Sequence, residues 1–263
     1  MKTIGFFGDS FCAKEYNQHS IDNNYKTYIQ QTCERLNIKL TSLGYGGSSV
    51  WDLYLMQLKP VIDKNELPDV SVMVWSHEGR LFHRIARSIH HASAANGYNK
   101  EKEKWFLKTF PNQPNFFQKE IWEAAKEYYL HIYDDEKEHI EYLAFLQYLD
   151  NNIFSKWPED KKLIHMWSFG IADRMEMVNN KNFDISTVGY PHDRRHGLEI
   201  RPALMCITSK EKWDKYPVLD DRPNHLGNHL NNKLVSDMLV EAIEMNKQNS
   251  VLNFTDKVKD FFK

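Results

Sequence analysis

The first ten residues join an apolar run to a short polar turn. Ile4-Gly5-Phe6-Phe7 has the composition of a buried strand, and Gly8-Asp9-Ser10 follows it directly. We expect a sharp turn at Gly8, because glycine tolerates the backbone conformations that tight turns require. That turn would place the Ser10 hydroxyl at the carboxyl end of the strand, the edge at which open α/β sheets build their active sites.

Four apolar segments alternate with helical patterns along the chain. The predicted strands cover residues 3–7, 39–43, 70–75 and 163–168, and the predicted helices cover about 25–36, 49–62, 80–95 and 226–246. Such an alternation is typical of an α/β fold with a parallel sheet. Residues 170–217 are rich in Asn, Asp, Arg, Gly and Pro and are predicted to form mainly loops.

One long segment after the third predicted strand interrupts the alternation. Residues 116–149 show a helical pattern dense in aromatic and charged side chains, in a connection longer than a βαβ unit needs. We predict one domain over residues 1–263 with a helical insertion at about 97–160. An aromatic stripe in it is predicted to pack as core, with a lid or an oligomer contact as alternatives: Phe117, Ile121, Trp122, Tyr128, Tyr129, Ile132 and Tyr133.

Composition limits the function classes. The formal net charge of −2 over 263 residues gives no electrostatic pull toward nucleic acid or anionic membranes. Three widely spaced cysteines, Cys12, Cys33 and Cys206, fit a reducing compartment and argue against a disulfide framework. No apolar run reaches the length of a signal peptide core or a membrane span. We therefore predict a cytoplasmic protein with no membrane span and no nucleic-acid partner.

Two further segments carry residues suited to acyl transfer. A serine needs a base to act as a nucleophile, and a candidate histidine lies in Asp221-Arg222-Pro223-Asn224-His225. The glycine-rich Gly44-Tyr45-Gly46-Gly47-Ser48-Ser49 follows the second predicted strand and offers backbone N–H donors. Together with Ser10, these segments favour a serine hydrolase.

The three segments, in this order, resemble the SGNH or GDSL hydrolase superfamily. The resemblance covers residues 1–76, 163–168 and 220–246, and the predicted insertion lies outside it. It implies a flavodoxin-like three-layer α/β/α fold. It also implies the activity of an esterase, lipase, thioesterase or carbohydrate deacetylase, acting on a small-molecule ester, a lipid or an acylated carbohydrate without a cofactor.

The resemblance assigns roles residue by residue. Ser10 matches the nucleophile, whose own N–H also faces the oxyanion, and Gly47 matches the second oxyanion donor. His225 matches the base, and Asp221 or Asp220 matches the acid that orients it, with Asp221 closer to the family spacing.

This chain departs from the family pattern at two points, the oxyanion donor after the third strand and the spacing between the acid and the base. The family has Gly-x-Asn-Asp after its third strand, whereas this chain has Trp75-Ser76-His77-Glu78 and so lacks the asparagine donor. His77 is the best replacement donor, and the alternative is that His77 caps a helix beginning near Glu78. The family's Asp-x-x-His spacing is also one residue longer here, because Asp221 lies four positions before His225.

The remaining predictions concern ligands. Asp9 and Ser48 flank the two oxyanion segments and are predicted to contact substrate, Asp9 also holding the turn. Arg194 and Arg195 form a basic loop that could select an anionic substrate group, or be ordinary solvated charges. We predict no metal site, because the histidine pairs spaced i, i+4 lack the glutamate of a His-Glu-x-x-His motif.

The sequence is also compatible with two functions other than ester hydrolysis. One is a catalytically weak or inactive protein of the same fold that binds a carbohydrate or acyl ligand. The other is an assembly role, including a homo-oligomer, through the helical insertion.

Overall fold

A computed structural model describes residues 2–14, 26–84, 87–90, 94–95, 97–109, 118–168, 196–207, 226, 229–247 and 249–261. Within these residues the main sheet has six parallel strands in the order β2-β1-β3-β6-β7-β8. The strands are β1 (Thr3–Gly8), β2 (Lys39–Ser42), β3 (Val70–Trp75), β6 (Lys162–Trp167), β7 (Leu198–Arg201) and β8 (Ser250–Asn253). The strand order reverses between β1 and β3, and such a switch point is where α/β sheets open a crevice for ligands.

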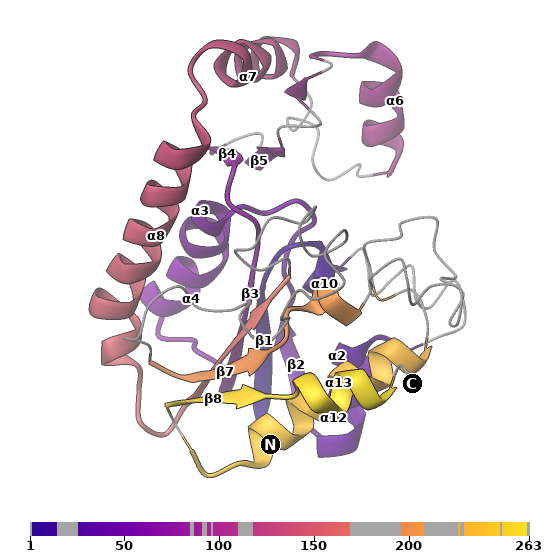
Figure 1. Cartoon of the computed structure of the whole chain (residues 1–263), viewed down its shortest axis with the longest axis vertical. Coiled ribbons are helices and arrows are strands. Elements are labelled where there is room, and N and C mark those ends of the chain that lie inside the picture. The colour runs from indigo at the N-terminus through magenta and orange to yellow at the C-terminus, as the bar shows by residue number, and fades with distance from the viewer. Residues whose placement is uncertain are drawn as a thin grey trace.

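The central strands are apolar on both faces, which explains the three layers. Along β3, Val72 packs into one hydrophobic cluster, whereas Met73 and Trp75 pack into another on the opposite face. Successive strand residues point to opposite sides of a sheet, so a strand that is apolar throughout needs a cover on each side. The prediction of a three-layer α/β/α fold with a parallel sheet is confirmed (Figure 1).

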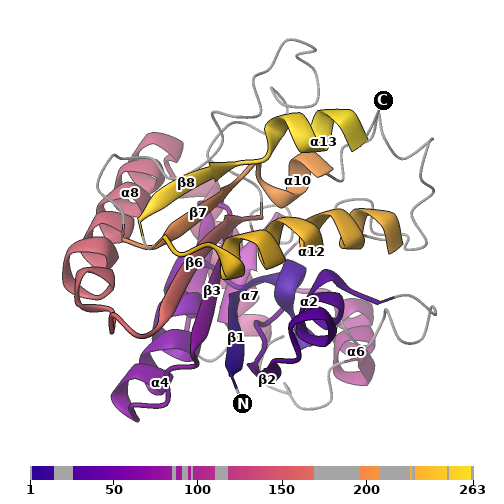
Figure 2. The same ribbon diagram turned by 90° about the horizontal axis from the view of Figure 1, so that it is seen from below.

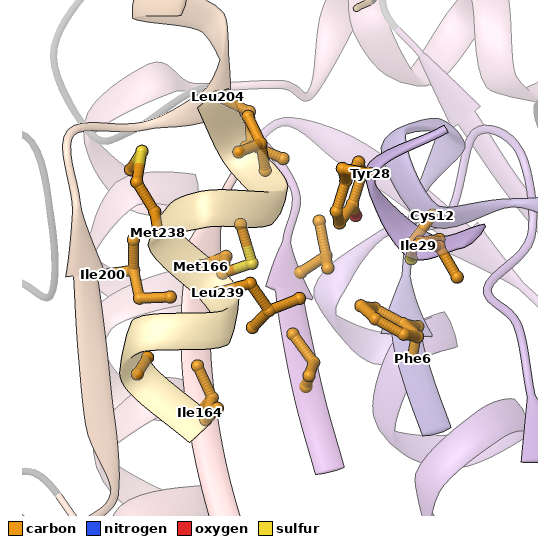
Figure 3. Packing of buried hydrophobic residues seen from close by; sticks show 14 of the residues in the cluster. Phe6, Cys12, Tyr28, Ile29, Ile164, Met166, Ile200, Leu204, Met238 and Leu239 are labelled. Atoms are coloured by element: carbon orange, nitrogen blue, oxygen red, sulfur yellow. The ribbon is translucent and has the colours of Figure 1, made fainter. Parts of the chain in front are cut away.

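Two groups of helices supply these covers (Figure 2). One face packs against α2 (Tyr28–Leu36), α10 (Leu204–Ile207), α12 (His229–Glu244) and α13 (Thr255–Phe261). Figure 3 shows Met238 and Leu239 of α12 and Tyr28 of α2 meeting side chains of the strands. The other face packs against α8 (Asp135–Asn152) and the helical stretch formed by α3 (Val50–Asp52), the π-helix η2 (Leu53–Leu58) and α4 (Lys59–Asp63).

In its described residues, the connection between β3 and β6 contains a hairpin, three α-helices and the 3₁₀ helix η3 (Phe154–Lys156). The hairpin strands are β4 (Arg80–His83) and β5 (Arg87–His90), and the helices are α6 (Lys100–Thr109), α7 (Lys119–His131) and α8. α8 buries Tyr142, Phe145, Leu146 and Leu149 against the main sheet. α7 packs on the hairpin instead, with Trp122 and Tyr129 buried beside Ile89. These two members of the aromatic stripe are therefore core, as predicted, whereas Ile132 is 65% exposed.

The structure corrects two of the local predictions. The helix predicted at 80–95 is wrong, because residues 80–83 and 87–90 pair as the antiparallel strands β4 and β5. The Tyr129 hydroxyl accepts the Leu81 N–H and lies 2.8 Å from the Ile89 carbonyl oxygen, so α7 satisfies backbone groups of the hairpin. The loop prediction for residues 170–217 missed β7 and α10. Both are only four residues long and therefore give little periodic signal.

The other helical predictions agree in position with α2, with the stretch from α3 to α4, and with α12. None of the helices in the described residues is long and apolar enough to cross a bilayer.

Candidate active site

Ser10 lies two residues beyond the end of β1, at the first position of a single 3₁₀ turn (Ser10–Cys12). Asp9 caps this turn, and its Oδ1 accepts the Phe11 N–H at 3.1 Å. The Ser10 side chain is half-buried, and its hydroxyl has no hydrogen-bond partner among the described residues. The sequence-predicted nucleophile is thus a hydroxyl at the carboxyl end of a central strand, beside the switch point between β1 and β3.

Gly8 allows β1 and β3 to pack closely under this turn. A Cβ at Gly8 would lie 2.3 Å from the Val74 carbonyl oxygen, a distance that no side chain tolerates. The backbone of Gly8 is held from the other side by Gln57 of η2. Its Oε1 accepts the Gly8 N–H at 2.8 Å, and its Nε2 donates to the Gly8 carbonyl oxygen at 3.0 Å.

Asp9 is fully buried and joins the ends of two strands. Its Oδ1 accepts a hydrogen bond from the hydroxyl of Ser168, the residue after β6, at 2.8 Å. The Arg80 guanidinium lies 3.9 Å from Asp9 Oδ2. Burial raises the pKa of Asp9 above its ordinary value, and the Arg80 charge and the hydrogen bonds from Ser168, Phe11 and Ser76 oppose this rise.

The glycine block runs beside the nucleophile turn. The Gly44 N–H donates to the Cys12 carbonyl oxygen at 3.0 Å, and the Tyr45 N–H donates to the Gly8 carbonyl oxygen at 3.1 Å. Gly47 has a φ of +79°, which favours glycine, and a Cβ there would meet no atom within 4 Å. Gly47 is exposed, and its N–H has no partner among the described residues. These features suit the second oxyanion donor predicted from the sequence.

Ser48 is fully buried at the end of this block. Its Oγ lies 2.8 Å from the Tyr45 carbonyl oxygen and 2.8 Å from Asp52 Oδ2, and it accepts a hydrogen bond from Gln57 Nε2 at 2.9 Å. Ser48 and Asp9 were expected to contact substrate, but both side chains bond to protein groups and neither reaches the surface. We therefore propose that both hold the scaffold of the site.

The segment after β3 reaches the same edge of the sheet. The Tyr142 hydroxyl donates to the Ser76 carbonyl oxygen at 2.9 Å, and His77 Nδ1 bonds to the Glu78 carbonyl oxygen. No helix begins at Glu78, so the alternative of a helix cap is wrong. His77, Arg80, Trp51 and several neighbours line a small pocket next to the glycine block.

Several predicted site residues lie outside the described residues. These are His225, Asp221, Asp220, Arg194 and Arg195. The structure thus brings Ser10, Gly47 and His77 to one edge of the sheet, and the roles of the base and its acid remain predictions. Two larger pockets lie at the opposite edge, beside the first residues of β3 and β6, away from Ser10. In the part of the chain that the structure describes, no group of three or more His, Cys, Asp or Glu side chains could hold a metal ion.

Four polar residues near Ser10 were not singled out from the sequence. Gln57, Ser88 and Ser168 are buried, and Arg80 is 9% exposed. Gln57 carried a detectable signal, because it is the polar position on the buried side of an apolar helical pattern, Leu53-Tyr54-Leu55-Met56-Gln57-Leu58. Arg80 and Ser88 carried none once their segment had been assigned to a helix.

Comparisons with known proteins give little further information. No protein-family model and no curated protein sequence matches this chain. A solved structure described as an acetyl xylan esterase, AlAXEase, aligns with 16% identity and a TM-score of 0.30. That alignment covers 100% of this chain and 80% of the other.

Proposed function

We propose that this protein is a serine hydrolase that cleaves a carboxylic ester through an acyl-enzyme. The observation that carries the proposal is the Ser10 hydroxyl at the β1/β3 switch point, in a turn to which the glycine block is hydrogen-bonded through Gly44 and Tyr45. A nucleophile next to backbone donors that are fixed in advance is the arrangement that acyl transfer requires. The turn that carries Ser10 supports the proposal, because three elements fix it. It follows β1 directly, Gln57 of η2 bonds to the Gly8 backbone, and Ser168 after β6 bonds to Asp9.

The proposed mechanism follows from the chemistry of these groups. His225 removes the Ser10 proton, and Ser10 Oγ attacks the carbonyl carbon of the ester. The N–H groups of Ser10 and Gly47 stabilise the negative charge on the carbonyl oxygen. Collapse of this intermediate expels the alcohol, which takes a proton from His225. Water then attacks the acyl-enzyme with His225 again as the base, which releases the acid and restores Ser10. Asp221 orients the His225 ring.

Covalent labelling with a fluorophosphonate tests the proposal directly, because this reagent requires an activated serine. We expect the wild-type chain to be labelled and Ser10→Ala to remain unlabelled while keeping its circular dichroism spectrum. His225→Ala should lose hydrolysis of a short-chain nitrophenyl ester, and His229→Ala serves as a matched control that should keep it. An unlabelled wild-type protein, or a dead His229→Ala beside an active His225→Ala, would contradict the assignment.

The same assay separates the two candidate acids. Asp221→Asn should lower kcat by about 10⁴-fold through loss of the correct histidine tautomer, as in other triads, whereas Asp220→Asn should have a small effect. The reverse result would assign the role to Asp220.

A further inference from the structure

We propose that the β4–β5 hairpin positions the oxyanion hole, with Arg80 and Ser88 as positioning residues. This inference rests on the proposed function and adds a role for a segment that lies outside the three sequence blocks around Ser10, Gly47 and His225. Figure 1 shows the hairpin beyond the carboxyl ends of β1 and β3, between the sheet and α7.

The hairpin holds one peptide group of the glycine block at both of its polar atoms. Arg80 Nη1 donates to the Ser48 carbonyl oxygen at 2.9 Å. The N–H of the same peptide group, that of Ser49, donates to Ser88 Oγ at 2.7 Å. Arg80 comes from β4 and Ser88 from β5, so the two strands act on opposite ends of one peptide plane.

This peptide group lies one residue beyond Gly47, where the backbone needs outside support. Gly47 has no side chain, a left-handed φ and no atom close to where a Cβ would lie. Nothing at Gly47 itself therefore fixes the direction of its N–H. One peptide group, Gly47–Ser48, separates the Gly47 N–H from the held peptide, so fixing the peptide plane at Ser48–Ser49 limits the directions in which that N–H can point. An error of about 1 Å in such a position can cost 10²-fold in rate.

Arg80 also links this peptide to the nucleophile turn. Its guanidinium lies 3.9 Å from Asp9 Oδ2, so one side chain spans the residue before Ser10 and the residue after Gly47. The guanidinium thus bonds to Ser48 through Nη1 and acts on the buried Asp9 carboxylate through its charge, while its planar shape fixes the direction of the Nη1 donor. A lysine could supply the charge but not this geometry.

The hairpin is itself braced by α7, which makes it a rigid support. The Tyr129 hydroxyl accepts the Leu81 N–H at 2.9 Å and lies within 2.9 Å of the Gly79 and Ile89 carbonyl oxygens. These contacts hold the first residues of β4 and the middle of β5 together. α7 thereby supports the strands that carry Arg80 and Ser88.

The test compares variants of the full-length protein by fluorophosphonate labelling and by ester hydrolysis per labelled serine. Ser88→Ala removes the acceptor for the Ser49 N–H, and Ser88→Thr retains a hydroxyl. We expect kcat to fall about tenfold in Ser88→Ala and about 100-fold in Arg80→Gln, with KM almost unchanged, because the lost interactions act on the transition state. Ser88→Thr should recover most of the activity, and Arg80→Lys should not.

Ser236→Ala is the matched control, because Ser236 is also a buried, hydrogen-bonded serine. Its Oγ lies 3.0 Å from Thr32 Oγ1, in the contact between α12 and α2. It should lower stability without changing kcat per labelled serine. Wild-type values of kcat in both Ser88→Ala and Arg80→Gln would overturn the inference and leave the proposed function intact. If the wild-type protein is not labelled, the proposed function and this inference are both wrong. If Arg80→Gln does not fold, the comparison of Ser88→Ala with Ser88→Thr decides alone.

Discussion

Gln57 pairs with Gly8 as a neighbouring strand would. Its amide oxygen accepts the Gly8 N–H at 2.8 Å, and its amide nitrogen donates to the Gly8 carbonyl oxygen at 3.0 Å. The second amide proton goes to Ser48 Oγ at 2.9 Å, so three of the four hydrogen bonds open to this side chain are made. One buried glutamine thus completes the pairing of β1 at its last residue and ties that residue to the glycine block.

We expect Gln57→Leu to destabilise the fold. The leucine fills similar space but leaves the buried Gly8 N–H without its partner, at a cost of about 2–3 kcal/mol in the free energy of unfolding. Urea unfolding measures this cost. Gln31→Leu is a suitable control, since Gln31 is also mostly buried but its side chain makes a single bond to the described residues, from Nε2 to the Lys26 carbonyl oxygen at 2.8 Å. A smaller loss for Gln57→Leu than for Gln31→Leu would contradict this role.

The glycines of the site should respond very differently to one added methyl group. Gly8→Ala places a Cβ 2.3 Å from the Val74 carbonyl oxygen and 2.7 Å from its Cβ, so β1 and β3 must separate. We expect a loss of about 3 kcal/mol in stability. Gly46→Ala meets no atom within 4 Å and should stay within about 0.5 kcal/mol of wild type. Thermal unfolding of the two variants, side by side, checks the prediction.

The layers of the fold could be predicted because their signal is local. The apolar residues of β1, β3 and β6 form continuous runs, and each has turn residues at its ends. The hairpin was missed for a physical reason. The strands Arg80–His83 and Arg87–His90 are only four residues long and do not alternate between polar and apolar residues, and their backbone is held by the Tyr129 hydroxyl, about 40 to 50 positions away.

The residues of the candidate site also divide into those that a local sequence pattern predicts and those that distant contacts place. Ser10 and Gly47 could be found from the sequence because a strand end and a glycine turn carry their own signature. Gln57, Arg80 and Ser168 act through contacts with residues 32 to 159 positions away, and no local pattern encodes these contacts.

Asp9 should make the free energy of unfolding fall as the pH rises above the ordinary pKa of aspartate. Burial raises its pKa above 3.8, so the folded protein still holds the proton at pH values where the unfolded chain has lost it. Its contribution to stability is therefore complete below the unfolded pKa and is lost as the pH rises through the raised folded pKa. Asp9→Asn removes this dependence. Urea unfolding from about pH 3 to about pH 8 should show the stability of wild type decreasing relative to the variant.

Asp237 provides the opposite control. Burial would raise its pKa, but hydrogen bonds from Lys233 and Arg35 outweigh burial and lower the pKa below 3.8. Its contribution is present above the unfolded pKa and is lost as the pH falls through the folded pKa. Asp237→Asn should therefore lose stability relative to wild type at neutral pH and match it in acid. If the difference between wild type and Asp9→Asn has this same sign, Asp9 does not have a raised pKa.

His77 tests whether the oxyanion hole has a third donor. The sequence places His77 where the family has an asparagine, but its Nδ1 bonds to the Glu78 carbonyl oxygen and is therefore not available to a substrate oxygen. We therefore expect His77→Ala to keep kcat within about threefold of wild type at mildly alkaline pH. His77→Asn supplies an amide donor at the family's position and should raise kcat above that of His77→Ala if the amide reaches the oxyanion. A fall of about 10²-fold in kcat for His77→Ala, with KM unchanged, would instead make His77 a catalytic donor.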